Sequence, residues 1–597
     1  MAIALQDSAV HPVGEPIPPY TDHAISVSLP KWEDNVGYEE GDPRVLDVMQ
    51  TGYPRFFIHK NITKLASICA SKFGTPSESA MLFPTARSAE HCRVFVAARS
   101  VPARVTHFAM PGPAPTTIVY AVLFPTSEFG VPKQFWQHTG LGISSRRAEH
   151  CLALLAAHSA PKAATKNKHY TVKPPRGVPS ALLVPAGSDG EEDTFERDQA
   201  LFLEERYGRN LSAQAAEEAK RAMKLRIAGV LVRDERGEVE VGVSVRGASV
   251  QESDVYLYPT GMSAIWSAHQ LALGAIGERK SICFGFPYTD TLKTLQKWGP
   301  GCHFLGNGVD SDIDELEKIL ADEHARDPST PPTLALFTEF PSNPLLRSAN
   351  LPRLRQLADK YDFLIVIDDT IGNFVNVEAL PYADIMVSSL SKIFSGEANV
   401  MGGSLVLNPA RKHYAALKTH QDATFENAYF DADAIFMERN SRDFQRRIAE
   451  IDANTEALCD LLHAASVQGG DASSPLTRVY YPKYETAANY EACRIKRDRG
   501  GRPGGFGGLF SVDFSSRAAS AAFFDALPCF KGPSLGTNFT LACPYTIIAH
   551  YVELPWAARY GVNDTLVRVS VGMQDREELV RGFEGALAAA RAVAAAE

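Results

Sequence analysis

The sequence predicts an α/β protein in which helices cover a mainly parallel sheet. Between residues 255 and 407, short apolar segments typical of buried strands alternate with amphipathic segments typical of helices. Several polar motifs follow directly after the strand-like segments, at the ends where ligands bind in such sheets. A long helical segment and then an α+β pattern complete the chain. This last part predicts a second, smaller domain.

Length and composition limit the class of protein. The 597 residues are too many for one ordinary hydrophobic core and predict about three or four domains. The net charge of -10 gives no general attraction to nucleic acid or to an anionic membrane, and no apolar run is long enough to cross one. Nine scattered cysteines without a CxxC pair, and an N-terminus without a signal pattern, predict a cytoplasmic protein with reduced thiols.

Changes in composition divide the chain into five parts. We predict an N-terminal extension over 1–160, a linker over 161–192, an N-terminal arm of the catalytic unit over 193–257, a large domain over 258–450 and a small domain over 451–597. The linker is first basic and proline-containing and then acidic, which is typical of a connecting segment. The first 30 or so residues of the extension are rich in proline and polar residues, which predicts a mobile arm.

The extension contains two predicted elements and one repeated four-residue phrase. A strand is predicted over 118–124 and a helix over 146–157. The phrase Ala-Glu-His-Cys occurs at 89–92 and again at 148–151. Adjacent His-Cys pairs are poorly spaced for chelation from a helix, so two helix starts or a chance echo explain the phrase better than a zinc site does. The residues that such a site would use are His91, Cys92, His150 and Cys151. No chemistry follows from the extension.

The catalytic unit is predicted in more detail. Its strand-like segments are 230–245, 281–286, 333–340, 363–367, 385–387 and 403–407. Its helical segments are 213–224, 264–273, 291–298, 312–324 and 351–361. A long helix over 443–465, strands over 510–514 and 566–571 and an alanine-rich helix over 576–595 follow. This order is typical of a parallel sheet followed by an α+β unit.

Two turns have residues suited to binding an anion. In Ser389-Leu390-Ser391-Lys392, small hydroxyl residues surround a single lysine, which suits an anion-binding turn that presents an amine. A serine-rich turn with a solvated lysine fits the same residues. In Thr260-Gly261-Met262-Ser263, the backbone N–H groups of a helix start can hold a phosphate. An ordinary helix N-cap without a ligand explains the same residues.

Four further side chains lie at or near strand ends. Asp368 ends a strand, where a carboxylate can reach a ligand, or it serves as a turn residue. Tyr288 can lie flat on an aromatic ligand or pack in the core. Asn343 sits in a Pro-Ser-Asn-Pro loop and can point its amide inward, or the loop is a plain turn. Arg568 interrupts an apolar strand, which favours a carboxylate partner if the side chain is buried.

Together these residues fit one cofactor. Pyridoxal 5'-phosphate needs a lysine for its aldehyde, a carboxylate for its ring nitrogen, donors for its phosphate and an aromatic face on its ring. Lys392, Asp368 and Tyr288 supply the lysine, the carboxylate and the aromatic face. No metal is needed for this chemistry.

The order and spelling of the motifs resemble the Cys/Met-metabolism family of pyridoxal-phosphate enzymes over about residues 195–597. Seven matches occur in family order, at 207–209, 260–264, 341–344, 368–370, 389–392, 534–536 and 566–570. The long N-terminal extension is similar to that of fungal members. The resemblance implies a fold type I enzyme with a seven-stranded, mainly parallel sheet and a smaller α+β C-terminal domain.

The resemblance also implies roles for individual residues. Lys392 would bond the cofactor's aldehyde and then move protons, Asp368 would keep the pyridine nitrogen protonated, and Tyr288 would stack on the ring and assist proton transfer. The implied phosphate ligands are Gly261, Met262, Ser389 and Ser391, and the implied ligands of the cofactor's 3'-oxygen and the substrate's α-carboxylate are Asn343, Ser534 and Arg568. Tyr207 and Arg209 would reach the phosphate of a neighbouring subunit, which implies an active homodimer and a homotetramer.

The implied reaction replaces the γ-acyloxy group of an activated homoserine with the thiol of cysteine. Pro533 stands where many γ-acting members have an acidic residue, and 537–540 also departs from the family pattern. Lys293 is a candidate for the substrate's acyl group, although a surface lysine fits as well. Elimination from cystathionine, homocysteine synthesis from sulfide and γ-substitution with another nucleophile in specialised metabolism stay open. A non-catalytic regulator would lack the lysine or the aspartate, and both are present.

Overall fold

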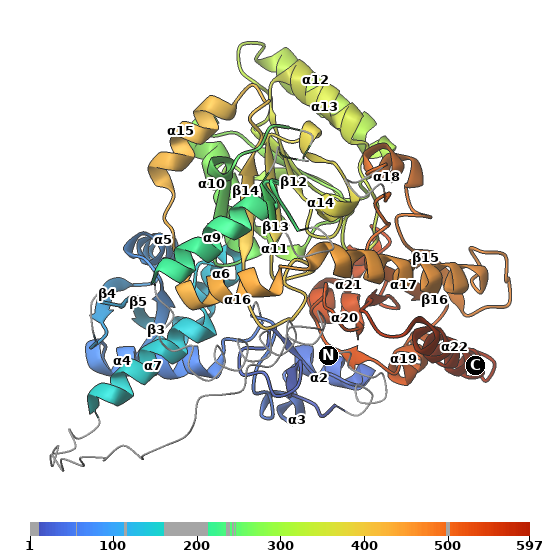
Figure 1. The fold of residues 1–597 in the computed structure, drawn as a ribbon, viewed down its shortest axis with the longest axis horizontal. Helices are drawn as coiled ribbons and strands as arrows, with labels where there is room; N and C mark the ends of the chain where they lie inside the picture. Colours follow the sequence, from blue (N-terminus) through green and yellow to red (C-terminus); the bar gives the residue numbers. More distant parts are fainter. Residues whose placement is uncertain are drawn as a thin grey trace, which may run out of the picture.

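A computed structural model describes residues 11–54, 56–112, 116–159, 213–233, 239–241, 244, 246, 248–496 and 502–597. Within these residues the chain forms a large sheet domain, a C-terminal domain beside it and an N-terminal region packed below both (Figure 1). We use "N-terminal region" for residues 11–159. A search of the described helices finds none that is long and apolar enough to cross a membrane. The predicted linker over 161–192 lies outside the described residues.

The large domain is built on a seven-stranded sheet, as predicted. Its strands, in spatial order, are β10 (Cys302–Leu305), β9 (Ser281–Phe284), β11 (Ala335–Glu339), β12 (Leu364–Asp368), β13 (Ile385–Ser389), β14 (Gly403–Leu407) and β8 (Val255–Tyr258). The first five run parallel, and β14 is antiparallel to both of its neighbours. The carboxyl ends of β11, β12 and β13 therefore meet at one edge of the sheet.

Helices cover both faces of this sheet, which explains why its strands read as continuous apolar runs. Along β12, Val366 packs on one face with α10 (Gly261–Ile276), α11 (Thr289–Lys297) and α15 (Tyr414–Thr424). Its neighbours Ile365 and Ile367 pack on the other face with α9 (Ala213–Ile227), α12 (Asp310–Arg326) and α13 (Leu351–Tyr361). Successive side chains on a strand point to opposite faces, so one strand contributes to two cores.

The C-terminal domain is an α+β unit, as predicted. Its five strands, in spatial order, are β15 (Leu476–Tyr480), β16 (Leu509–Phe514), β19 (Val567–Ser570), β18 (Leu541–Cys543) and β17 (Phe530–Lys531). Helices α17 (Phe444–Ala464), α19 (Arg517–Ala526) and α22 (Arg576–Ala594) pack on this sheet through buried residues such as Leu458, Phe523 and Phe583. α17 leads from the large domain into this unit (Figure 1).

The N-terminal region has a sheet of its own. β3 (Glu78–Phe83), β5 (Ile118–Pro125) and β4 (Arg104–Ala109) form a three-stranded antiparallel sheet. α4 (Lys60–Phe73) and α7 (Ser145–Ser159) pack on one side of it, and α5 (Ala86–Ala97) and α6 (Gly130–Thr139) pack on the other. The two Ala-Glu-His-Cys phrases begin at the fourth residue of α5 and of α7, which confirms that they mark helix starts. No group of metal-binding side chains occurs among the described residues.

The prediction of a mobile arm was wrong for residues 11–30. Strands β1 (Pro16–Ile17) and β2 (Ser26–Val27) pair, and Ile17 and Ile25 are buried against Phe530, Phe539 and Leu541 of the C-terminal domain. The arm is therefore fixed by apolar contacts to residues about 500 positions away, and its local composition gives no sign of those contacts.

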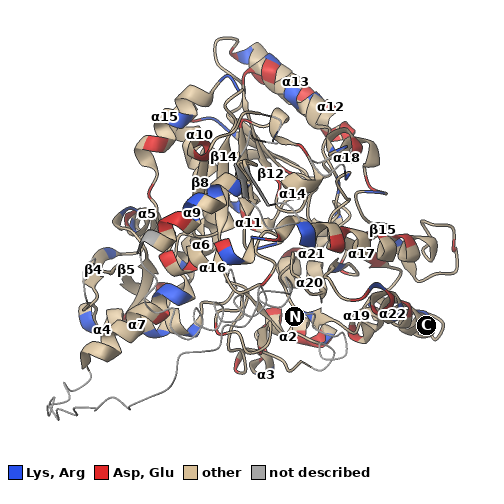
Figure 2. Ribbon diagram, viewed as in Figure 1, with Lys and Arg blue, Asp and Glu red and all other residues tan. Residues whose placement is uncertain are grey.

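Charged residues are mixed over the outside of the molecule. Figure 2 shows acidic and basic residues interspersed along the outer helices. On α12 and α13, for example, Arg353 pairs with Asp314 and Glu317.

Candidate active site

A cavity opens where β11, β12 and β13 end. Nine of the predicted site residues line it: Gly261, Met262, Tyr288, Asn343, Asp368, Ser389, Ser391, Lys392 and Arg568. Ser534 contacts the lysine from the loop before β18. The sequence motifs, which span more than 300 positions, therefore meet at one place in the fold. The N-terminal region also lines this cavity, which the sequence did not indicate.

Lys392 follows β13 in a tight turn and is only 7% exposed. Its Nζ lies 3.3 Å from the hydroxyl of Ser534 and 3.2 Å from the hydroxyl of Tyr53. The Ser391 hydroxyl accepts the N–H of Gly402 and donates to the Gly402 carbonyl, which ties the turn to the neighbouring strand. The expected contact of Ser391 with a phosphate stays a prediction.

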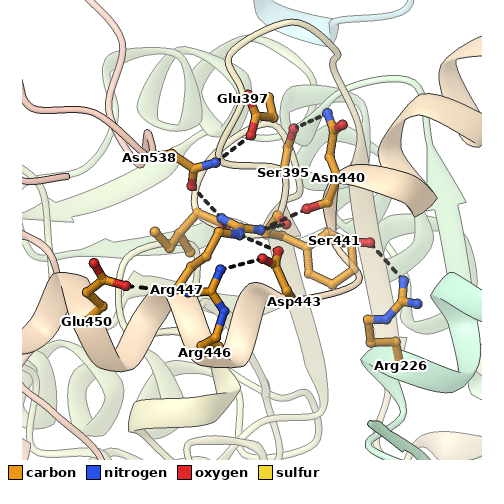
Figure 3. Close-up of polar contacts among 12 residues, drawn as sticks. Arg226, Ser395, Glu397, Asn440, Ser441, Asp443, Arg446, Arg447, Glu450 and Asn538 are labelled. Atoms are coloured by element: carbon orange, nitrogen blue, oxygen red, sulfur yellow. Dashed lines mark hydrogen bonds and ion pairs between the residues drawn. The ribbon is translucent and has the colours of Figure 1, made fainter. Parts of the chain in front are cut away.

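A buried arginine holds the segment that follows Lys392. Arg447 of α17 is 2% exposed and donates hydrogen bonds to the carbonyl oxygens of Ile393 and Phe394 at 3.1 Å and 2.9 Å. It also donates to Oδ1 of Asn538 at 2.7 Å, and it pairs with Asp443 at 2.8 Å (Figure 3). The departure from the family pattern at Asn538 therefore lies in a structural network and not in the cavity lining.

We expect Arg447→Met to lower the stability of the enzyme by about 3 kcal/mol, because several buried oxygens lose their donor. The measurement is an earlier unfolding transition in urea. Arg446→Met is the matched control, since the neighbouring Arg446 is 66% exposed and its pairs with Asp443 and Glu450 should contribute less than about 1 kcal/mol. Equal shifts for the two variants would contradict this role for Arg447.

Two carboxylates lie side by side at the floor of the cavity. Glu339 and Asp368 are register partners on β11 and β12. Burial raises the pKa of Asp368 to about 6, while burial and the neighbouring Asp368 charge raise the pKa of Glu339 to about 8. Glu339 accepts the backbone N–H groups of Tyr288, at 2.5 Å, and Asn343, at 3.0 Å, so it holds the loops that carry both side chains. Sequence reasoning missed Glu339, and its signal was an acidic residue within an apolar strand.

The Glu339 carboxyl should make the cofactor-free protein less stable as the pH rises. Its pKa is raised in the folded state, so its stabilising contribution is complete below about pH 4.5 and is lost as the pH rises through about 8. We expect Glu339→Gln to reduce the stability difference between pH 5 and pH 9, measured by urea unfolding. Glu584→Gln on the exposed face of α22 is the control and should leave that difference unchanged. An unaltered pH dependence in Glu339→Gln would refute this role.

The start of α10 is shaped for an anion. The Thr260 side chain accepts the N–H of Ser263 and caps the helix, which leaves the N–H groups of Gly261 and Met262 at its open end. A Cβ at Gly261 would lie 2.6 Å from the Cβ of Ser389, so only glycine lets the helix start approach the end of β13. Backbone donors and a serine hydroxyl thus line one side of the cavity, as a phosphate requires.

Arg568 also lines the cavity and is 4% exposed. Its guanidinium donates to Oδ1 of Asn343 at 3.1 Å and to the carbonyl oxygens of Pro533 and Ser534 at 2.9 Å and 3.1 Å. The expected carboxylate partner is not found, because in the described part of the chain these hydrogen-bond partners of Arg568 are neutral oxygens. A buried cation held by neutral groups is suited to bind an incoming carboxylate.

One predicted residue, Lys293, is not brought to the cavity, and two others cannot be placed. Tyr207 and Arg209 lie outside the described residues. Lys293 lies on α11, does not line the cavity and has its amine 3.6 Å from the carboxylate of Glu553. Its proposed contact with an acyl group therefore has no support in the geometry. Pro533 does line the cavity and turns its carbonyl to Arg568.

The donor set fits pyridoxal phosphate. A buried amine, a carboxylate and an aromatic side chain lie in one cavity with a helix start, and the glycine at that start lets it approach the hydroxyl-bearing Ser389 closely. Lys392, Asp368, Tyr288 and the first turn of α10 would hold the cofactor's aldehyde carbon, ring nitrogen, ring face and phosphate.

Comparisons with known proteins agree with this fit. Residues 249–588 match the family model "Cys/Met metabolism PLP-dependent enzyme", and residues 61–144 match "Fungal trans-sulfuration enzyme, N-terminal domain". The chain is 52% identical to the cystathionine gamma-synthase-like enzyme iboG2 of Amanita muscaria, over 98% of each protein. It is 42% identical to the cystathionine gamma-synthase of Neurospora crassa, over 96% of this chain and 98% of that protein. It is also 33% identical to the alanine racemase ungC of Aspergillus violaceofuscus, over 97% of this chain and 96% of that protein.

Proposed function

Because the chain belongs to the Cys/Met metabolism family of pyridoxal-phosphate-dependent enzymes, we propose that it is a cystathionine γ-synthase. In this reaction the thiol of L-cysteine replaces the γ-acyloxy group of an O-acylhomoserine, which leaves as a carboxylate. The product is L-cystathionine, and the reaction is a transsulfuration step in methionine biosynthesis. The observation that carries the proposal is the buried cation of Arg568 in the same cavity as the Lys392 amine, because this pair selects an α-amino acid. The similarity to the Neurospora crassa enzyme over nearly the whole chain supports the specific reaction.

The proposed mechanism assigns one task to each side chain. Pyridoxal phosphate, when bound, withdraws electrons from the carbons next to the substrate's amine. Arg568 binds the α-carboxylate and so orients the substrate, and Lys392 Nζ takes the proton from Cα and returns it later. Ser534 fixes Nζ from 3.3 Å, and Asp368 holds a proton on the ring nitrogen.

A second candidate is a different reaction of the same family. The similarity to an enzyme named alanine racemase favours it, since such chemistry stops at Cα. A cystathionine lyase, an O-acetylhomoserine sulfhydrylase and a γ-substitution in specialised metabolism use the same lysine and carboxylate. Pro533, which lines the cavity, stands at a position where these activities can differ.

Product analysis separates these reactions. Purified enzyme is incubated with O-acetylhomoserine or O-succinylhomoserine, each with cysteine, with sulfide or without a nucleophile, and L-cystathionine and L-alanine are tested alone. We expect cystathionine as the main product only when an acylhomoserine and cysteine are both present. Homocysteine, a 2-oxoacid or D-alanine as the main product would replace the proposal with the corresponding alternative. Lys392→Ala enzyme serves as the blank.

We also propose that the enzyme acts in the cytoplasm. All nine cysteines are free and eight of them are buried, which suits a reducing compartment. A homodimer or homotetramer in which Tyr207 and Arg209 reach a neighbouring subunit is a proposal that rests on the family resemblance. Light scattering of the purified protein measures the assembly.

A further inference from the structure

The N-terminal region forms one wall of the active-site cavity. Six of its lining residues are His23, Tyr53, Phe56, His59, Trp136 and Gly140. They come from the loop before α4, from the paired β1–β2 segment and from the end of α6. The cavity that holds Lys392 is therefore bounded by three parts of one chain.

This wall is fixed to the catalytic unit by specific contacts. The hydroxyl of Thr260, which caps α10, donates to the carbonyl of Gly140 at 3.1 Å. Gly140 has a φ of +63°, and a Cβ there would lie 2.2 Å from Oγ1 of Thr260, so the close approach requires glycine. A buried ion pair between Arg146 and Asp433, at 3.1 Å, joins α7 to α16 (Asp431–Asn440). The N-terminal wall therefore packs directly on the start of α10, where we expect the phosphate to bind.

Within this wall, Tyr53 contacts the amine nitrogen of Lys392. Its hydroxyl oxygen lies 3.2 Å from Lys392 Nζ, as an acceptor, and 3.4 Å from the hydroxyl of Tyr288. The centre of its ring lies 4.5 Å from the same Nζ, within the range of a cation–π contact. The ring of Tyr53 is supported by Phe56 at a centroid distance of 5.6 Å.

From this geometry we propose that Tyr53 is a catalytic residue, supplied by the N-terminal region to the active site of its own chain. Its oxygen and ring face stabilise the protonated Lys392 amine and keep Nζ at the position where it exchanges protons with the substrate. No bond to Tyr53 forms or breaks, and the proton that Nζ takes from Cα returns to the substrate without passing to Tyr53. The inference rests on the proposed use of Lys392 as the proton carrier, and it does not depend on which nucleophile the enzyme accepts.

Other ionisable side chains near the Lys392 amine also affect the pH midpoint that tests the role of Tyr53. Besides Tyr53 and Lys392, the charged and titratable side chains that line the cavity in the described part of the chain are His23, His59, Tyr288, Glu339, Asp368, Tyr545 and Arg568. Of these, Tyr288 also contacts Tyr53. The buried thiol of Cys543 also interacts electrostatically with Lys392. The substitution that tests Tyr53 must therefore keep its ring, so that the positions of these neighbours are preserved.

The first test is Tyr53→Phe in the full-length holoenzyme. Hydrogen bonds to the charged form of a group favour that form, so losing this acceptor should move the pH midpoint of the lysine-bound cofactor's absorbance down by about one pH unit. We also expect exchange of the substrate's α-proton in D2O, without a nucleophile, to slow by about tenfold. Tyr120→Phe, on β5 and outside the cavity lining, is the matched control. A wild-type midpoint and a wild-type exchange rate in Tyr53→Phe would overturn the proposal.

The second test asks whether Tyr53 acts within its own chain. Differently tagged Tyr53→Ala and Lys392→Ala chains are co-expressed, and the exchange rate of doubly purified protein is compared with the sum of the two variants alone. We expect no recovery, because each chain lacks one residue of its own site. Recovery of a substantial fraction of wild-type exchange would show that Tyr53 reaches across subunits and would overturn the assignment. Co-expression of wild-type and Lys392→Ala chains is the control for mixing.

The two kinds of failure are distinguishable. If the product panel identifies another family reaction while Tyr53→Phe still shifts the absorbance midpoint, the reaction assignment fails and the role of Tyr53 stands. If cystathionine is the product and the midpoint does not move, the reaction stands and the role of Tyr53 fails.

Discussion

Lys392→Ala is expected to abolish the visible absorbance of the lysine-bound cofactor and to reduce turnover by about four orders of magnitude or more. Lys392 is the lysine that lines the cavity in the described part of the chain, and the other basic side chains of that lining are His23, His59 and Arg568. Absorbance spectra of the purified variant with added pyridoxal phosphate, together with product analysis, measure both effects.

The matched control is Lys293→Ala. Lys293 lies on α11, pairs with Glu553 and does not line the cavity, so its loss should leave the spectrum and the product unchanged. A wild-type visible band in purified Lys392→Ala would refute the assignment of the cofactor-bonding lysine.

Asp368→Asn is expected to reduce turnover by about a thousandfold while the protein still folds, because a neutral amide no longer holds a proton on the ring nitrogen. Burial raises the pKa of Asp368 to about 6, so the ionised carboxylate lowers the stability of the folded protein at neutral pH. Removing that charge should leave the unfolding free energy of the cofactor-free protein at pH 8 unchanged or higher. Activity and stability therefore move in different directions, which separates a chemical role from a folding role.

Kinetics of Asp368→Asn with saturating cofactor, and urea unfolding of the cofactor-free form, make this measurement. Asp322→Asn, at an exposed position of α12, is the control and should change neither quantity. A variant of Asp368 that keeps wild-type turnover, or that loses activity only because it unfolds, would contradict the proposed role.

The sheet could be predicted from the sequence because most of its strands are buried on both faces. Apolar runs such as β12 and β14 are unmistakable, and the segments between them carry a clear helical period. β10 was missed because it lies at the edge of the sheet and three of its four residues are only half-buried. Its short segment, Cys302–Leu305, lacks the uniform burial that makes the other strands recognisable.

Site residues were predictable where a motif sits at a strand end. Asp368 is the last residue of β12 and Lys392 lies in the turn after β13, so their neighbourhood could be anticipated from the order of the elements. Tyr53 and Ile17 could not be placed in this way. Both depend on segments more than 300 positions away, and no local pattern in a single sequence records such contacts.

Because the N-terminal region packs on the cavity, we expect the folding of this region to be coupled to the binding of pyridoxal phosphate. A ligand that binds only the folded state stabilises every element that lines its site, in proportion to the logarithm of its concentration. Since Gly140 and Tyr53 belong to that lining, the cofactor protects the N-terminal region from opening and hence from proteolysis. Loss of the cofactor would then leave the N-terminal region more open to proteolysis.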